Sequence, residues 1–171
     1  VPYPVGYENG DALKDLHKQA ETVVFGLKVG AVTAQPDREI IAVIAYLLIE
    51  GDRTVDAQAL RLADSDWRSE PFLLVEFSNL LATQVRAKAL SAAQAKSLLE
   101  SAAQQVAAWV EVPHAEALAV ALERQVSAYD ARFVACARRL SAPLVTEDSR
   151  LRAATPGSSM SIAEAVSRAI G

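Results

Sequence analysis

The sequence has little cysteine and no long hydrophobic run, and these absences already exclude several classes of protein. One cysteine among 171 residues cannot form an internal disulfide, which argues against a disulfide-stapled secreted scaffold and favours the reducing cytoplasm. The most apolar stretch, residues 40–49, is about half as long as a bilayer span, so no membrane segment is expected. The first residues lack a basic stretch followed by an apolar one, so no signal peptide is expected either.

Positive charge is scarce as well. The chain has 17 Lys and Arg residues against 21 Asp and Glu residues, a net charge of −4, which argues against a generally basic nucleic-acid-binding surface. The whole sequence has 51% hydrophobic and 22% charged residues, the composition of an ordinary globular domain. The length is sufficient for one domain with a real core.

Helical patterns alternate with short apolar segments along most of the chain. Brief strands are expected at residues 72–74, 110–112 and 143–146, each between helices. This alternation predicts an α/β fold with three layers, α/β/α, around a short parallel sheet of about four strands over residues 37–171. Residues 1–36 are interpreted as an amino-terminal extension of uncertain structure, in which residues 26–36 are ambiguous and residues 27–33 could form a strand.

Three acids occur near the ends of separate elements. Glu76 follows the first brief strand, Asp130 lies at the entry of a helix, and Asp148 follows the last strand. The carboxyl ends of parallel strands converge, so the three carboxylates could share a pocket that suits Mg²⁺ or Mn²⁺. Each acid also has a purely structural interpretation. Asp130 completes a capping box with Ser127, Asp148 is a possible N-cap, and Glu76 could face solvent near a helix start.

Basic and aromatic residues give weaker signals. Arg132 is expected to point away from the core, and with other arginines of the last third of the chain it could meet RNA phosphates. A solvated helix face explains these arginines equally well. Trp67 lies in a polar segment and is the better candidate for a contact surface, whereas Trp109 ends an apolar stripe and is expected in the core.

Three motifs together resemble a known family. The stretch FLLVEFSNLL holds Glu76 and Asn79 in an E-x-x-N arrangement, SAYDARF holds Asp130 within Y-D-A, and LVTED holds Thr146 and Asp148 within L-V-T-x-D. Their order and spacing resemble the PIN domain, specifically the VapC-type toxin ribonucleases of type II toxin–antitoxin systems. The resemblance covers roughly residues 54–157, most of the chain.

The resemblance implies a PIN-like domain with Mg²⁺- or Mn²⁺-dependent endoribonuclease activity. It also implies an RNA substrate, a cognate antitoxin protein as partner and a homodimer. On this basis Glu76, Asp130 and Asp148 would hold the metal, and Asn79 and Thr146 would orient ligands or water around it.

The sequence departs from the family pattern in its amino-terminal part. The family begins with a strand that ends in an aspartate, which should fall near residue 40, where the sequence reads Ile-Ile-Ala. Asp37 is the nearest possible substitute as a metal ligand. The departure motivates an alternative, a degenerate PIN-like protein that binds RNA or an antitoxin without cleavage. A third hypothesis, an unrelated α/β interaction module, predicts that the three acids lie far apart.

Overall fold

The computed structural model describes residues 42–49 and 53–170, so Asp37, the extension at residues 1–36 and the ambiguous stretch at residues 26–36 lie outside the described part. In order, the elements are α2 (Ala42–Leu48), α3 (Thr54–Ala63), β1 (Arg68–Ser69), α4 (Phe72–Arg86), α5 (Ala92–Gln105), β2 (Ala108–Trp109), α6 (His114–Arg124), α7 (Ala128–Leu140), β3 (Leu144–Val145), α8 (Ser149–Ala154), β4 (Ser159–Met160) and α9 (Ile162–Ile170). None of the described helices is both long and apolar enough to cross a bilayer.

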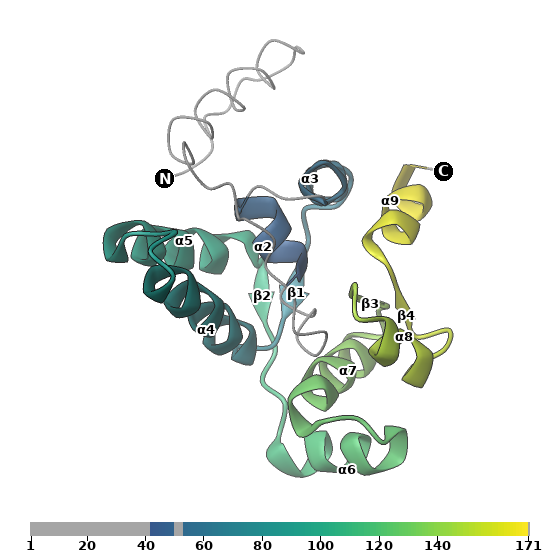
Figure 1. Ribbon diagram of the computed structural model, residues 1–171. Helices are drawn as coiled ribbons and strands as arrows, with labels where there is room; N and C mark the ends of the chain where they lie inside the picture. The colour runs from purple at the N-terminus through teal and green to yellow at the C-terminus, as the bar shows by residue number, and fades with distance from the viewer. Residues whose placement is uncertain (1–41, 50–52, 171) are drawn as a thin grey trace.

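The strands form two parallel pairs. β1 pairs with β2, with Arg68 opposite Ala108, and β3 pairs with β4, with Leu144 opposite Ser159. In Figure 1 both pairs lie in the middle of the molecule, with α2, α3 and α9 on one side and α6 and α7 on the other. The predicted α/β class and the parallel strands are therefore confirmed, and the four strands are divided between two small sheets.

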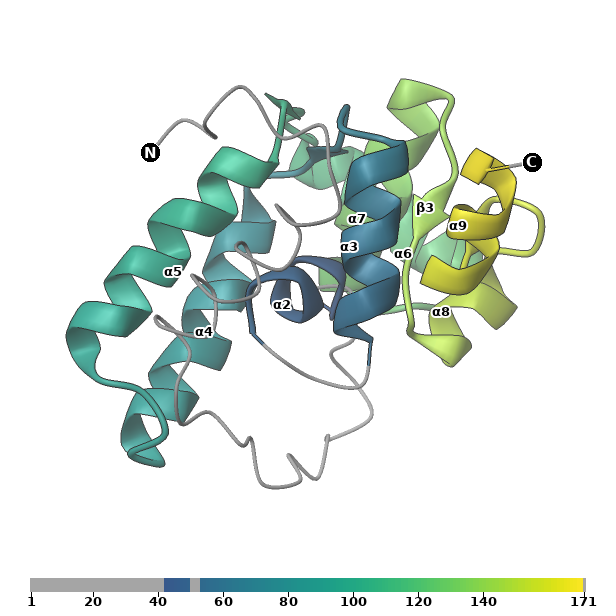
Figure 2. The same ribbon diagram turned by 90° about the horizontal axis from the view of Figure 1, so that it is seen from above.

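Two clusters of buried apolar side chains hold these layers together. The larger cluster includes Phe77 of α4 and Phe133 of α7, which are 0% and 3% exposed. The smaller cluster joins α2, α3 and α9 through four buried residues, Val43, Leu60, Ile162 and Ala165. Figure 2 shows α3 beside α9, at the opposite side of the molecule from α4 and α5. Trp67 packs against both clusters.

Helix starts follow the local sequence signals. Ser91 and Gln94 cap α5 reciprocally, the Ser91 hydroxyl accepting from the Gln94 amide and the Gln94 side chain accepting from the Ser91 amide. Ser161 and Glu164 make the corresponding pair of contacts at the start of α9. These local contacts satisfy amide groups that a helix leaves without intrahelical partners.

Two expected strands are wrong in place or type. Residues 72–74 are the first turn of α4, because Pro71 suits a helix start and Leu73, Phe77 and Leu81 repeat at helical spacing toward the core. The strand expected at residues 110–112 lies two residues earlier, as β2. Trp109 belongs to it and is 36% exposed rather than a core residue. Trp67, expected at a contact surface, is half-buried between the two clusters.

Candidate active site

The turn after β3 holds Asp148 in a buried position. Its Oδ1 accepts hydrogen bonds from the amides of Arg150 at 2.8 Å and Leu151 at 3.0 Å, so Asp148 is the N-cap of α8. The fully buried Thr146 accepts the Asp148 amide through its hydroxyl at 3.1 Å. Arg152 donates to the Thr146 carbonyl at 2.7 Å. The turn is therefore rigid, and Oδ2 of Asp148 accepts no hydrogen bond from the described residues.

Asp130 occupies the third position of α7 and is half-buried. The Ser127 hydroxyl donates to its Oδ2 at 2.6 Å, and the Asp130 amide donates back to that hydroxyl at 3.1 Å. Asp148 is thus an N-cap, as one interpretation of the sequence expected, whereas Asp130 accepts the Ser127 hydroxyl and not the Ser127 amide, so the expected capping box is only half formed. The N-cap contacts of Asp148 use its Oδ1, which leaves its Oδ2 to meet a ligand.

Glu76 lies on α4, four residues after Phe72 and therefore on the same face of the helix. The ring of Phe72 stacks on that of Tyr129, with centroids 5.3 Å apart, and this contact brings the start of α4 against the start of α7. Glu76 and Asp130 thus belong to two helix starts that touch. Asn79 is exposed on α4, and its backbone carbonyl accepts a hydrogen bond from the Thr83 hydroxyl at 2.8 Å.

A buried ion pair fastens the same helix starts. Glu70, 2% exposed, accepts Nη2 of Arg132 on Oε1 and the Phe72 amide on Oε2 at 2.6 Å. Arg132 also donates to the Val112 carbonyl at 3.0 Å and contacts His114 Nδ1 at 3.0 Å. The hydrogen bond and charge of Glu70 raise the pKa of the Arg132 guanidinium, so this residue is a permanent cation. One ion pair therefore joins the segments that begin α4, α6 and α7.

The family assignment rests on a comparison of the whole chain. The family model of the PIN domain matches residues 42–155. This chain belongs to the PIN domain family. A solved structure that resembles it is the crystal structure of PAE2754 from Pyrobaculum aerophilum, 21% identical, with a TM-score of 0.58, over 78% of this chain and 92% of that chain. That likeness shows the fold, and no curated protein matches the chain.

PIN domains are in general metal-dependent nucleases that act on RNA. Carboxylate oxygens are the donors that Mg²⁺ and Mn²⁺ prefer, so the chemistry of Glu76, Asp130 and Asp148 suits such an ion. Among residues 42–49 and 53–170, no three His, Cys, Asp or Glu side chains gather closely enough to form a metal site. The described part of the chain therefore does not bring Glu76, Asp130 and Asp148 together as one metal site.

Three arginines of α7 pair with carboxylates. Arg132, predicted to point outward, lies in the buried pair with Glu70. Arg138 and Arg139 bind Glu123 and Glu116 of α6, at 2.8 Å and 2.6 Å. In both exposed pairs a cation on α7 meets an anion on α6, at the edge of the contact between the two helices.

Sequence reasoning missed Glu70 altogether. An acid directly before Pro71 at the start of an apolar helix is a local sign that it binds helix amides, and the Phe72 amide confirms that role. Its cation is 62 residues away, and no local pattern connects the two.

Proposed function

We propose that this PIN domain is a metal-dependent endoribonuclease and the toxin component of a toxin–antitoxin pair. The observation that supports the proposal best is the extent of the PIN match, which spans all three acid motifs. The proposed catalytic domain is residues 37–171, preceded by an extension at residues 1–36.

In this proposal Glu76, Asp130 and Asp148 hold one Mg²⁺ or Mn²⁺ ion, and Asp37 is a candidate fourth ligand. When bound, such an ion lowers the pKa of a coordinated water and stabilises charge on the leaving oxygen of a phosphodiester. Asp148 offers Oδ2, since Oδ1 is occupied by the α8 amides. Thr146 fixes the backbone of Asp148 and so orients that oxygen, as a supporting residue rather than a catalytic one.

The partners in this proposal are the RNA substrate, a cognate antitoxin and a second copy of the chain in a homodimer, in the cytoplasm. An antitoxin segment with a basic side chain would block the pocket by pairing with its carboxylates. Asn79 is exposed on α4 and would orient a ligand or water at the rim of the site.

The test uses three variants in parallel. Asp148→Asn keeps the helix cap, because Asn caps as well as Asp, but it removes the charge that a metal needs. Asp130→Asn removes the corresponding charge on α7 and can still accept the Ser127 hydroxyl, and Asp56→Asn at the start of α3 is the matched control outside the site. We expect Mn²⁺ binding by calorimetry and RNA cleavage in the unaltered protein and in the control, and loss of both in the two site variants.

Other outcomes separate the alternatives. Metal binding without cleavage of any RNA tested would favour the degenerate PIN-like protein. No binding at millimolar Mn²⁺ would refute the shared metal site.

A further inference from the structure

Tyr129 is an exposed aromatic residue beside a candidate metal ligand. It is the second residue of α7, it is 60% exposed, and Asp130 follows it directly. Burial stabilises aromatic rings, so most of them lie in the core of a protein. Among the described residues the other exposed aromatic is Trp109 on β2, at 36%. The most exposed aromatic ring in the described part of the chain therefore lies next to Asp130.

The Tyr129 ring rests on a fixed support. It stacks on Phe72 with the ring centroids 5.3 Å apart and the ring planes 23° apart. The guanidinium carbon of Arg132 lies 5.8 Å from the centroid of the same Phe72 ring, and the buried Glu70 holds that guanidinium in place. Within the described part of the chain, Tyr129 makes no second ring contact. One face of the ring is thus held in a set orientation, and its exposure leaves the other face open.

This ring lies where two of the acid-bearing helices meet. Phe72 and Glu76 are four residues apart on α4 and therefore share one face of that helix. Tyr129 covers Phe72 from α7, and its neighbour in the sequence is Asp130. A nucleic acid that reaches the carboxylates of α4 and α7 therefore passes the exposed ring.

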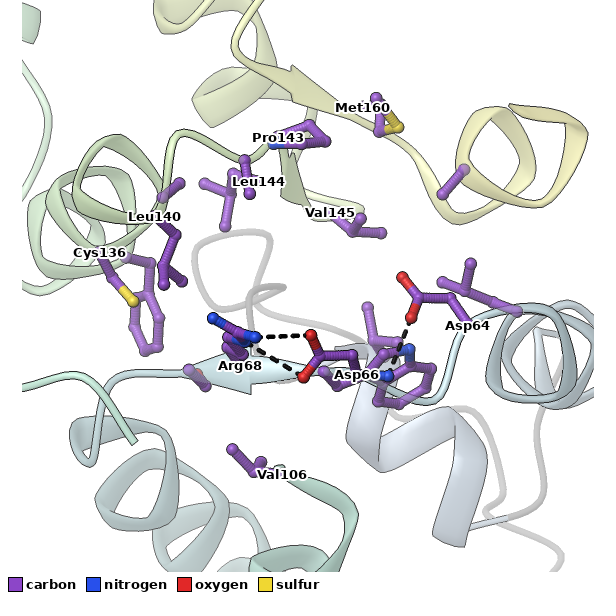
Figure 3. A pocket seen from close by; sticks show the side chains of 18 of the residues that line it. Asp64, Asp66, Arg68, Val106, Cys136, Leu140, Pro143, Leu144, Val145 and Met160 are labelled. Atoms are coloured by element: carbon purple, nitrogen blue, oxygen red, sulfur yellow. Dashed lines mark hydrogen bonds and ion pairs between the residues drawn. The ribbon is translucent and has the colours of Figure 1, made fainter. Parts of the chain in front are cut away.

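Unpaired positive charge is scarce around this ring. All three arginines of α7 pair with carboxylates, namely Arg132, Arg138 and Arg139. Figure 3 shows the same for Arg68, which lines a cavity of about 680 Å³ and pairs with Asp66 at 2.7 Å. Phosphate contacts need cations that are not already neutralised, whereas stacking on a base needs only an aromatic face. Stacking is therefore the contact with RNA that this part of the surface can supply.

We propose that the open face of the Tyr129 ring stacks on one base of the RNA substrate. The inference rests on the proposed ribonuclease function, because the stacked base would place its own phosphate near the carboxylates of α4 and α7. Every base has an aromatic face, so this contact holds the strand without reading its sequence. Since Phe72 already orients the ring, binding orders little that was free before, which favours affinity.

Binding of a labelled single-stranded RNA, measured by fluorescence anisotropy with Ca²⁺ in place of Mn²⁺, tests the stack apart from cleavage. Tyr129→Leu removes the ring but still covers Phe72, and it should weaken binding by about 5- to 150-fold. Tyr129→Phe keeps the ring and should restore the affinity. Trp109→Leu removes an exposed ring from β2 and is the matched control, which should bind as the unaltered protein does. Unchanged affinity in Tyr129→Leu would overturn the proposal.

RNAs that each lack one base test the same contact in the unaltered protein. Removal of the stacked base should weaken binding more than removal of any other base. In Tyr129→Leu this extra loss should disappear, because the base no longer has a ring to stack on. A loss that is the same at every position, or one that persists in Tyr129→Leu, would refute the stack.

Cleavage of the same RNAs in Mn²⁺ separates this inference from the proposed function. Binding that depends on Tyr129, with no cleavage, would support the stack and refute the nuclease. Cleavage with an affinity that does not depend on Tyr129 would refute the stack and leave the nuclease standing. Absence of RNA binding by the unaltered protein would refute the stack.

Discussion

Replacement of Arg132 by methionine removes the cation from the buried pair with Glu70 and leaves a carboxylate that is 2% exposed without its partner. Methionine keeps an unbranched apolar stem at this position, so the change removes chiefly the guanidinium group with its charge and hydrogen bonds. Nη2 of Arg132 also donates a hydrogen bond to the Val112 carbonyl, which loses this donor in the variant.

The size of the effect follows from burial. Removal of one member of a buried ion pair costs about 3–5 kcal/mol, because the remaining charge stays out of water without compensation. The Arg132 side chain keeps 15% of its exposure, which admits some solvent, so we expect the low end, about 3 kcal/mol. In a domain of this length each kcal/mol lowers Tm by about 2–4 °C, which gives a predicted decrease of about 6–12 °C.

Urea and thermal denaturation followed by circular dichroism measure this effect. The double variant Glu70→Leu with Arg132→Met should recover most of the loss, since it removes both charges together. Glu123→Gln, in the exposed pair with Arg138, is the control and should leave Tm nearly unchanged. A decrease below about 2 °C for Arg132→Met, or no recovery in the double variant, would refute the role given to the pair.

Four further outcomes are expected. Thr146→Val should destabilise the protein by about 1–3 kcal/mol in urea titrations, because the Asp148 amide loses its buried acceptor. Asp148→Ala should be less stable than Asp148→Asn by about 1 kcal/mol in the same titrations, and equal stability would contradict the N-cap role. Burial raises the pKa of the Cys136 thiol to about 11, so its alkylation at pH 8 should be on the order of 100-fold slower in native than in unfolded protein. The hydrogen bonds from Arg138 lower the pKa of the Glu123 carboxyl. The small stability that this exposed pair contributes is therefore present above the ordinary glutamate pKa and should be lost as acid protonates Glu123 in the folded protein, which faster amide exchange in α6 would show.

Local contacts were predictable from the sequence, and distant ones were not. The caps at Ser91, Ser127 and Asp148 depend on residues two or three positions away, so the pattern alone identifies them. The pair of Glu70 with Arg132 depends on how α7 crosses the end of β1, which no local pattern encodes. An arginine expected to face solvent is consequently part of the interior.

Strand prediction failed for a related reason. β1 and β2 have two residues each, Arg68–Ser69 and Ala108–Trp109, too few for an alternating pattern. They are strands because a parallel neighbour pairs with them. The three acid motifs were recognisable because each lies within a few residues, whereas whether their carboxylates meet in one ligand sphere depends on the packing of α4, α7 and the β3–α8 turn.

The separate cluster under α9 bears on how the protein folds. α9 is anchored on α3 by a core of four buried residues, whereas α4 and α7 share a much larger one. Elements with a small share of buried apolar surface open at a lower free energy than the whole domain, so the α3–α9 pair is expected to unfold first as a cooperative unit of its own. Trp67 packs against both clusters, so in a protein with Trp109 replaced by phenylalanine the tryptophan fluorescence should change at both stages of unfolding.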